Sequence, residues 1–242
     1  MASRRNALQE RFFNALISGD RPEVRGVVDE LIDAGCSAEE ILSRMFWPIA
    51  EQIDGLHRGD QLSDACFHYA TRLLRMLVDQ MQLRLSRQDA RGEVVLVMSG
   101  AGELEELAGQ MTSDLLEAAG FEVRYMGGGV ANDEIVDQLG NLGVDRLVVF
   151  GAVAGTVPQT RLLIDRLHDT GVCPKLQITV GGGVFNRADG LAEEIGADLW
   201  AEEPEHIVEA MIEEASRRMT PDQRTVGRRR RSGGGGRQRE AA

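Results

Sequence analysis

Few residues in this 242-residue chain have the types and spacing that could support chemistry, and most of them follow short apolar runs. Three glutamates, Glu103, Glu105 and Glu106, come directly after the glycine-rich segment 99–102. Glycines also follow three other apolar runs, at 127–129, 151–155 and 181–183. Glycine lets the backbone approach a flat or bulky ligand closely, although a tight turn alone can also require it. Four such loops together favour a binding face.

The first loop is an incomplete match to a dinucleotide site. Gly100 and Gly102 begin the G-x-G-x-x-G pattern, but Glu105 stands where the third glycine belongs. The second apolar run ends at Met126 and Gly127 and carries no acid that could bind a ribose. Glutamates at the start of the following helix suit the helix dipole but repel a pyrophosphate. The pattern therefore argues against nucleotide binding.

No arrangement of nucleophile and base is recognisable, so we expect a protein that is not itself an enzyme. Ser99 has no histidine at a predictable position, and Cys173 lies in a loop at the amino end of the expected sheet. The three cysteines are far apart and form no C-x-x-C pair, which argues against a disulfide framework or a zinc site. Free cysteines suit a reducing cytoplasm.

The elements that must position these loops fall into two domains. Residues 1–88 carry apolar residues three and four apart, which predicts four antiparallel helices. Asp20 is expected to cap the second helix, and Ser37 with Glu40 has capping-box spacing before the third. A fourth, long helix is expected over 64–87.

Residues 92–216 alternate short apolar runs with helical stretches. Strands are expected at 93–98, 121–126, 145–150, 175–180 and 198–200, and helices at 105–118, 132–142, 159–169, 187–195 and 204–218. This alternation predicts a doubly wound, parallel, five-stranded sheet of the Rossmann-like α/β class. Ligands bind such sheets beyond the carboxyl ends of the strands, where the glycine-rich loops lie.

Charge divides the chain into an acidic body and a basic tail. The formal net charge is −12, yet residues 217–242 hold nine arginines against Asp222 and Glu240. An acidic body binds polyanions poorly, so nucleic acid would be bound only weakly, through an unstructured tail at 217–242. A solubilising end is the alternative interpretation of this tail. Without a signal peptide or an apolar run of 18 residues, we expect a cytoplasmic protein with no membrane partner.

Several short segments occur in an order that is typical of one family. They are Leu62-Ser63, His68 and Ala70-Thr71 in the helical domain, then Leu116 to Val123, Thr156-Val157-Pro158, Val180-Gly181-Gly182 and Ile195 to Asp198. Over roughly residues 12–213 the chain resembles the cobalamin-binding module of methionine synthase, corrinoid methyl carriers and light-sensing repressors. The resemblance implies a helical cap, residues 1–88, followed by a Rossmann-like cobalamin-binding domain, residues 92–216.

The chain departs from this family at the residues that carry its chemistry. The D-x-H-x-x-G motif, whose histidine is the lower cobalt ligand, falls on 103–108: Glu103 keeps the acid, Glu105 replaces the histidine and Ala108 replaces the glycine. A serine at the end of the third strand is replaced by Phe150. By the resemblance, these changes fill the channel for the nucleotide tail of cobalamin.

The family's W-x9-E-H motif in the cap maps onto His57, Phe67 and His68. The resemblance places His57 above a bound ring, where a neutral imidazole could ligate the metal of a cobalamin or a haem, with Glu105 or no ligand below. A carboxylate is the poorer cobalt ligand. Equally, His57 can be a partly exposed loop residue and His68 a packing residue. The candidate cofactor-binding residues are His57, His68, Glu103, Glu105, Ala108, Phe150, Thr156, Gly181 and Gly182, with His57 and Glu105 as metal ligands.

Three functions follow from these features. The first is a cobalamin- or tetrapyrrole-responsive regulatory sensor whose cap reports occupancy to a regulatory protein partner, with homo-oligomer formation through the cap. Only about eleven residues precede the first cap helix, so no DNA-binding domain of its own is expected. The second is a cofactor-free relative that acts as a scaffold. The third is the corrinoid carrier subunit of a methyltransferase.

Overall fold

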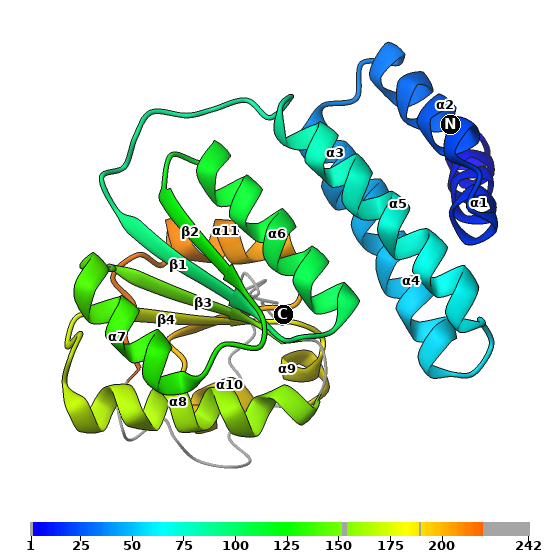
Figure 1. The fold of residues 1–242 in the computed structure, drawn as a ribbon. Coiled ribbons are helices and arrows are strands. Elements are labelled where there is room, and N and C mark those ends of the chain that lie inside the picture. Colours follow the sequence, from blue (N-terminus) through cyan, green and yellow to red (C-terminus); the bar gives the residue numbers. More distant parts are fainter. Residues whose placement is uncertain (1, 152–153, 189, 220–242) are drawn as a thin grey trace, which may run out of the picture.

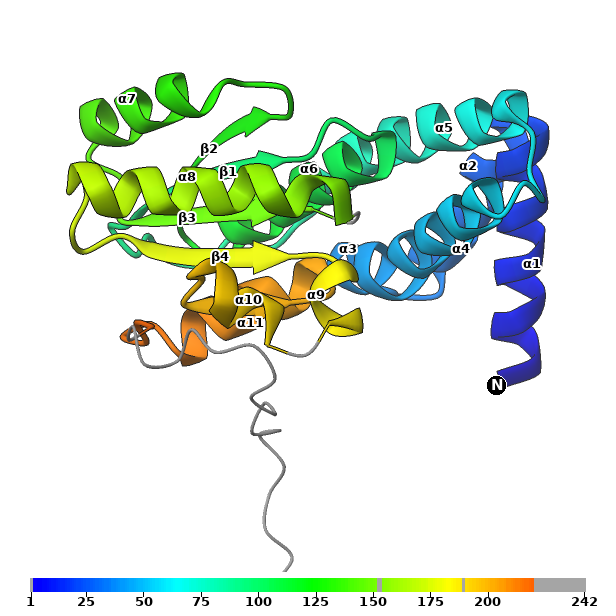
Figure 2. The ribbon, with the colours of Figure 1, turned by 90° about the horizontal axis from the view of Figure 1, so that it is seen from below.

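The computed structural model describes residues 2–151, 154–188 and 190–219. A helical cap at the amino end lies beside an α/β domain, and Figure 2 shows the two parts next to each other with α1 on the far side of the cap. The predicted basic tail lies outside the described residues from position 220 onward. Within the described ranges, no helix is long and apolar enough to span a membrane.

The cap contains the four expected helical segments, one of them interrupted. They are α1 (Ala2–Ser18), α2 (Arg21–Asp33), the run α3 (Ala38–Ile41), η1 (Leu42–Phe46) and α4 (Trp47–Arg58), and α5 (Asp64–Gln82). The Asp20 side chain accepts from the Glu23 amide, and Ser37 and Glu40 form the predicted capping box. Ser63 caps α5 by accepting from the Cys66 amide.

The third segment contains a turn of π-helix that periodicity did not predict. Pro48 follows it and has no N–H, so the carbonyl of Arg44 cannot receive its usual helical donor. The Trp47 amide instead donates to Leu42, five residues back, and Gln9 of α1 donates to the Arg44 carbonyl at 3.5 Å. Single π turns of this kind are frequent at functional sites. The proline therefore shapes the helix that carries Trp47.

The sheet confirms the predicted parallel α/β architecture. Its strands are β1 (Val94–Ser99), β2 (Glu122–Gly127), β3 (Arg146–Phe150), β4 (Gln177–Gly181) and β5 (Leu199–Ala201), in the order β2-β1-β3-β4-β5 with every pair parallel. β2 is added on one side of β1, and β3 to β5 are added on the other side. The boundary between β1 and β3 is therefore the topological switch point, where ligands bind in such folds.

Helices cover both faces of the sheet. They are α6 (Glu103–Ala118), α7 (Asn132–Leu142), the 3-10 turn η2 (Ala154–Thr156), α8 (Val157–Thr170), α9 (Val184–Arg187), α10 (Leu191–Ile195) and α11 (Pro204–Glu213). In Figure 1, α6 and α11 lie on one face, and α7, α8 and α10 on the other. Successive β1 residues alternate between the two cores: Val95 and Val97 face α6, while Leu96 and Met98 face α7.

The core under α6 continues without interruption into the cap. It joins buried residues of α1, α4 and α5 to α6, α11 and the sheet. Cap helices α4 and α5 both contact α6. The cap is therefore fixed by the same apolar burial that holds the sheet, which is the dominant favourable contribution to folding.

Three helix predictions need correction. The long helix expected over 64–87 ends at Gln82. The helix expected over 187–195 is two short helices, because Gly190 between them adopts the left-handed conformation at φ 81°. The last helix was expected to reach residue 218 but ends at Glu213. Beyond it, the Gln177 amide donates to the carbonyls of Glu214, Ala215 and Arg217. Asp198 accepts from the Met219 amide, so these contacts hold the chain in a non-helical path.

A buried arginine connects the strands at the amino end of the sheet. Arg146 of β3 donates to the Glu93 carboxylate, to Gln177 at 2.7 Å and to the Met211 carbonyl at 2.6 Å. Its guanidinium also lies over the Phe121 ring at 5.3 Å. The cluster joins β3, β4 and α11 far from the glycine-rich loops, so its role is to hold the sheet together.

Replacing Arg146 with alanine leaves buried acceptors on Gln177 and Met211 without a donor. We expect the free energy of unfolding, measured with urea, to fall by about 3 kcal/mol. Arg124→Ala is the control, because Arg124 forms an exposed ion pair with Glu122 and its loss should cost less than about 1 kcal/mol. Equal losses in the two variants would contradict the assigned role.

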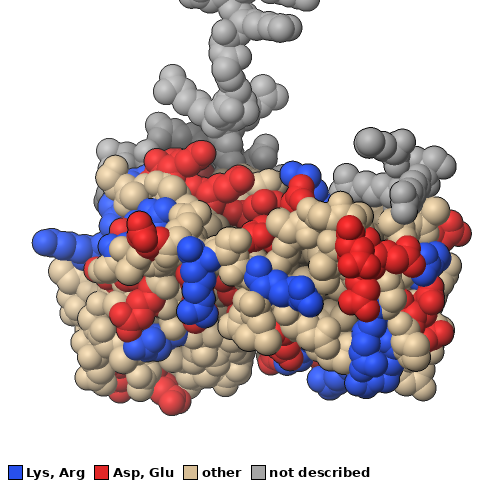
Figure 3. Space-filling view, turned by 90° about the horizontal axis from the view of Figure 1, so that it is seen from above, with Lys and Arg blue, Asp and Glu red and all other residues tan. Residues whose placement is uncertain are grey.

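Charges on the described surface are mixed in sign. Figure 3 shows lysine and arginine interspersed with aspartate and glutamate over one face of both domains. A surface of alternating charge offers no extended basic stripe to a nucleic-acid backbone on that face. The predicted weak contact through the basic tail lies almost wholly outside the described residues.

Candidate functional site

A cavity of about 410 Å³ lies between the cap and the carboxyl ends of the strands. Helix α4 supplies one wall; Leu104 of α6, Gly183 after β4 and Glu202 after β5 supply the other. The α4 residues are Trp47, Pro48, Glu51, Gln52 and Arg58. This is the end of the sheet at which the sequence predicts ligand binding.

Trp47 of the cap and Phe150 of the sheet are in aromatic contact at this site. Their rings meet edge to face with centroids 5.6 Å apart, and both side chains are almost fully buried. Among the described residues, the Trp47 Nε1–H has no hydrogen-bond acceptor. Phe150 also packs on Gly181, where a Cβ would come within 2.7 Å of the Phe150 ring, so a larger residue at 181 would displace it. Phe150 thus fills the space above the end of β3.

Glu105 lies where the family has its lower histidine, and it is folded back onto its own loop. Its side chain is 4% exposed, and Oε2 accepts from the Gly102 amide at 3.1 Å in a capping arrangement. The same carboxylate lies directly against Gly100 and close to Gly151. Glu105 therefore closes the ends of β1 and β3, as the resemblance implies.

The two neighbouring glutamates are paired with the cap. Glu103 lies 3.1 Å from Arg72 and 3.6 Å from Arg75, and Glu106 lies 3.0 Å from Arg75. Both arginines belong to α5. The acidic start of α6 is thus neutralised by the cap, and these ion pairs bridge the two domains.

His57 and His68 lie together around Phe67 in the cap. The His57 ring stacks on Phe67 at 4.1 Å, and its Nε2 lies 2.8 Å from the Asp64 carboxylate. The hydrogen bond from His57 lowers the pKa of Asp64. His68 is exposed, with its ring 6.0 Å from Phe67. Of the described residues that line the cavity, none is a histidine.

The two proposed metal ligands therefore have separate partners: Asp64 for His57, and Gly102 for Glu105. In the described ranges, no group of three or more histidine, cysteine, aspartate or glutamate side chains is arranged to hold a metal ion. Metal ligation by His57 requires its Nε2 to leave Asp64 or its other ring nitrogen to be used. It stays a prediction.

The remaining predicted residues occupy the strand ends. Ala108 is buried in α6 and its carbonyl accepts from Thr112, so it packs in the core. Thr156 ends η2, and its hydroxyl lies against Gly151. Gly182 has φ 112° and donates to the Ala201 carbonyl at 3.0 Å. Of the described residues that line the cavity, none is one of the predicted cofactor-binding residues, and Gly183 directly follows two of them.

Sequence reasoning missed the polar residues of the cavity wall. Glu51 lies on α4, across from Glu202 on the α/β domain. Burial first, and then the negative charges of Glu202, Glu203 and Asp54, raise the pKa of Glu51 to about 7, while Arg58 opposes them. The cavity therefore presents acids of both domains to a ligand.

Two family models match the chain, and both describe a B12 binding domain. One matches residues 93–212 and the other residues 8–82, so the α/β domain and the cap are each recognised in order. The chain belongs to the B12-binding family. Cobalamin is the cofactor of this family, which confirms the cofactor expected from the sequence.

Among proteins similar to this B12-binding chain are methylamine corrinoid proteins. Dimethylamine corrinoid protein 3 of Methanosarcina acetivorans is 25% identical over 205 residues, covering 77% of this chain and 95% of that protein. Its namesake from Methanosarcina mazei is 26% identical over 121 residues, covering 49% of this chain and 71% of the relative. The structure of the Methanosarcina barkeri monomethylamine corrinoid protein shares the fold, with a TM-score of 0.67 at 16% identity over 86% of this chain and 98% of that one.

The residues present fit a corrin ring but not the family's histidine ligation. Glycine backbone at Gly183 and apolar groups on Trp47 and Leu104 suit the face of a flat macrocycle. The buried Trp47 N–H, which has no acceptor among the described residues, offers a donor to its edge. Below, Glu105 and Phe150 occupy the ends of β1 and β3. The site accordingly suits a ring held between cap and sheet without an imidazole from α6.

The raised pKa of Glu51 predicts a pH-dependent stability. Its pKa is about 7 in the folded protein against an ordinary 4.5, so ionisation disfavours the folded state. The raised pKa therefore contributes to the stability of the folded protein in full at pH values below the ordinary pKa of 4.5. This contribution is lost as the pH rises through about 7. We expect Glu51→Gln to unfold at higher urea than the unchanged protein at about pH 8 and at similar urea at about pH 5.

Glu10→Gln, on the exposed side of α1, is the control for this comparison. Asp114 has a pKa raised to about 7, mainly by burial, and is present in both proteins, so some pH dependence remains in the variant. If the urea midpoint of Glu51→Gln differs from that of the unchanged protein by the same amount at both pH values, the raised pKa assigned to Glu51 is refuted.

Proposed function

We propose that this protein is a corrinoid-carrying subunit that holds cobalamin between its cap and sheet for a methyltransferase partner. The observation that carries the proposal is the cavity walled by α4 above and by the glycine-rich strand ends below. Support also comes from the relatives, which are named as methylamine corrinoid proteins and of which one is matched over 95% of its length and another over 71%. They are named as corrinoid proteins rather than as methyltransferases, in agreement with a subunit that is not itself the catalyst.

The chain's own residues supply binding and orientation. Trp47 and Leu104 provide apolar surface for the ring, Gly182 and Gly183 allow close approach of the backbone, and Gln52 offers an amide to its edge. When bound, cobalamin supplies a cobalt centre that accepts and releases a methyl group. Glu105 and Phe150 exclude water and the nucleotide tail from the ends of β1 and β3.

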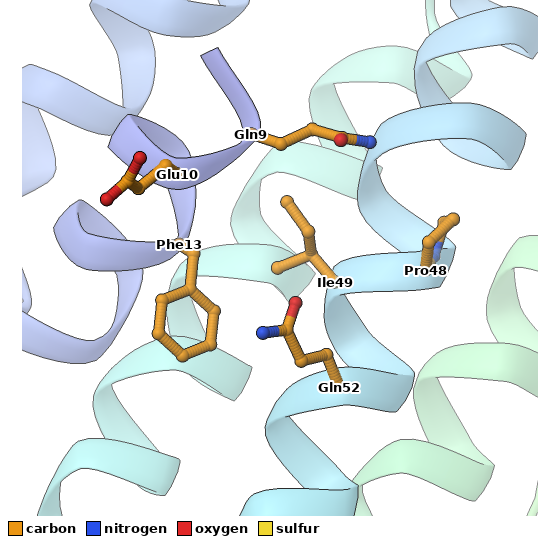
Figure 4. A pocket seen from close by; sticks show the side chains of 6 residues that line it. All are labelled: Gln9, Glu10, Phe13, Pro48, Ile49 and Gln52. Carbon is orange, nitrogen blue, oxygen red and sulfur yellow. The ribbon is translucent and has the colours of Figure 1, made fainter. Parts of the chain in front are cut away.

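Unfilled volume lies on two sides of α4. A second cavity, of about 330 Å³, lies on the outer side of this helix; in Figure 4, Gln9, Glu10 and Phe13 of α1 surround it with Pro48, Ile49 and Gln52 of α4. Pro48 and Gln52 line both cavities. The buried face of α4 nevertheless belongs to the core shared with α6, so admitting a ring requires part of that packing, including the contact between Trp47 and Phe150, to be replaced by the ligand.

A second candidate, the regulatory sensor, is favoured by the ion pairs between the domains. Arg72 and Arg75 of the cap pair with Glu103 and Glu106 of α6. Lifting the cap over a ring would break these pairs and present their charges to a regulatory partner. Occupancy of the cavity would then be reported by the position of the cap, as in any two-state switch biased by its ligand.

Binding is tested with the Trp200→Phe variant, which leaves Trp47 as the single tryptophan. Hydroxocobalamin and methylcobalamin should remain bound through desalting and quench the fluorescence of Trp47. Trp47→Leu, in the otherwise unchanged chain, should retain less pigment, because it loses both apolar surface and the N–H donor. His57→Ala tests ligation from above: a changed visible spectrum would support it.

If both cobalamins wash off the unchanged protein, the corrinoid function fails and the cofactor-free scaffold is favoured. Haemin, tested in parallel, addresses the alternative cofactor. Demethylation of the bound methylcobalamin by a methyltransferase partner would favour the carrier over the sensor. An unreactive but tightly bound cobalamin would favour the sensor.

The sensor also makes its own prediction. If the cap must lift, the double variant Arg72→Gln, Arg75→Gln lowers the cost of opening, and cobalamin should bind about two- to fivefold more tightly at low salt. Salt should shrink this difference, since exposed pairs are screened. Arg11→Gln is the matched control, because Arg11 pairs only with Glu23 and Glu30 inside the cap. Equal affinities in all three proteins would contradict the switch.

A further inference from the structure

Resting on the proposed corrinoid function, we propose that Glu51 and Glu202 make the cavity selective for macrocycles whose edge carries neutral carboxamides. Macrocycles whose edge carries carboxylates are excluded. Cobalamin belongs to the first class, and haem and the carboxylic-acid corrinoids belong to the second. The two glutamates would thus determine which tetrapyrrole the cleft accepts.

The two acids face the cavity from opposite domains. Glu51 projects from α4 of the cap, and Glu202 follows β5 at the carboxyl end of the sheet. The remaining polar lining comes from Gln52 and Arg58, and the apolar lining from Trp47, Pro48 and Leu104. A ring between cap and sheet would therefore place part of its edge between the two carboxylates.

The charges around Glu51 are predominantly negative. Glu202, Glu203 and Asp54 are close enough to raise the pKa of Glu51, and Arg58 is the one cation that opposes them. Arg58 is also the only cation among the described lining residues, and its guanidinium is bound to Asp54 at 2.6 Å. A carboxylate on a ligand would meet like charges here, which disfavours it strongly in a partly buried site.

A carboxamide meets complementary groups in the same place. Its NH₂ donates to a glutamate carboxylate, and its oxygen accepts from an amide or an indole N–H. The buried Trp47 N–H, which has no acceptor among the described residues, supplies one such donor, and Gln52 supplies another. Buried polar groups without a partner are rare, so the indole is an independent sign that the site takes a ligand with an acceptor.

Selection should weaken in acid. Protonation of Glu51 removes one of the repelling charges, while Glu202, Glu203 and Asp54 remain beside it with Arg58. A carboxylate-bearing ring should therefore bind better at about pH 6 than at about pH 8. An amide-bearing ring should change little over the same range.

The test compares two corrinoids with the same ring and metal in the full chain. Dicyanocobinamide carries carboxamides, and dicyanocobyrinic acid carries carboxylates. Dissociation constants are measured by absorbance titration at about pH 8. In the unchanged protein we expect cobinamide to bind at least about thirtyfold more tightly, because carboxylates are repelled from the acidic walls.

Glu51→Gln and Glu202→Gln should each reduce this ratio by about threefold or more, and the double variant by about tenfold, mainly because dicyanocobyrinic acid binds more tightly once the repelling charge is gone. Glu10→Gln is the matched control, because Glu10 lines the outer cavity and should leave the ratio unchanged. Two single variants from different domains guard against the loss of either one to misfolding.

The inference is overturned if the unchanged protein binds both corrinoids equally, or if cobinamide binds and neither glutamine variant changes the ratio. These results leave the corrinoid function standing. If neither corrinoid binds the unchanged protein, the proposed function fails and the inference fails with it.

Discussion

The contact between Trp47 and Phe150 is the constraint on which the rest of the structure depends. It closes the cap directly over the switch point of the sheet, with both rings buried. Gly181 must lack a side chain for Phe150 to lie there. The π turn and Pro48 determine how Trp47 is presented on α4. A ligand that binds between cap and sheet must replace this aromatic contact with its own surface. The affinity for the ligand therefore depends on how much more favourable its apolar contacts are than the lost contact between Trp47 and Phe150.

Much of the fold follows from local pattern. Apolar residues at helical spacing and buried runs between glycines predict the cap and the parallel sheet, and Asp20 and Ser37 cap their helices as expected. Long-range contacts were beyond such reasoning. The π turn needs Gln9 from another helix as well as Pro48, and the end of α11 is set by Gln177 on the sheet. Both depend on partners far away in the sequence.

The candidate site could be predicted only in part, because it too depends on contacts between residues far apart in the sequence. Motif spacing located Glu105 and Phe150. It did not predict that the Glu105 carboxylate folds back to accept from the Gly102 amide. The acidic start of α6 suggested a charged opening, whereas arginines of α5 neutralise it. Glu51 belongs to no motif, and its importance arises only because the fold brings it opposite Glu202.

A crystal structure of the protein with cobalamin, and the position of the Trp47 ring in it, would test the account most directly. The centroids of Trp47 and Phe150 are now 5.6 Å apart. The account predicts that they separate, with the corrin between α4 and the strand ends and with Glu105 still bound to the Gly102 amide. A corrin bound elsewhere with the aromatic contact intact, or one for which Glu105 has left its loop to reach the cobalt, would contradict it.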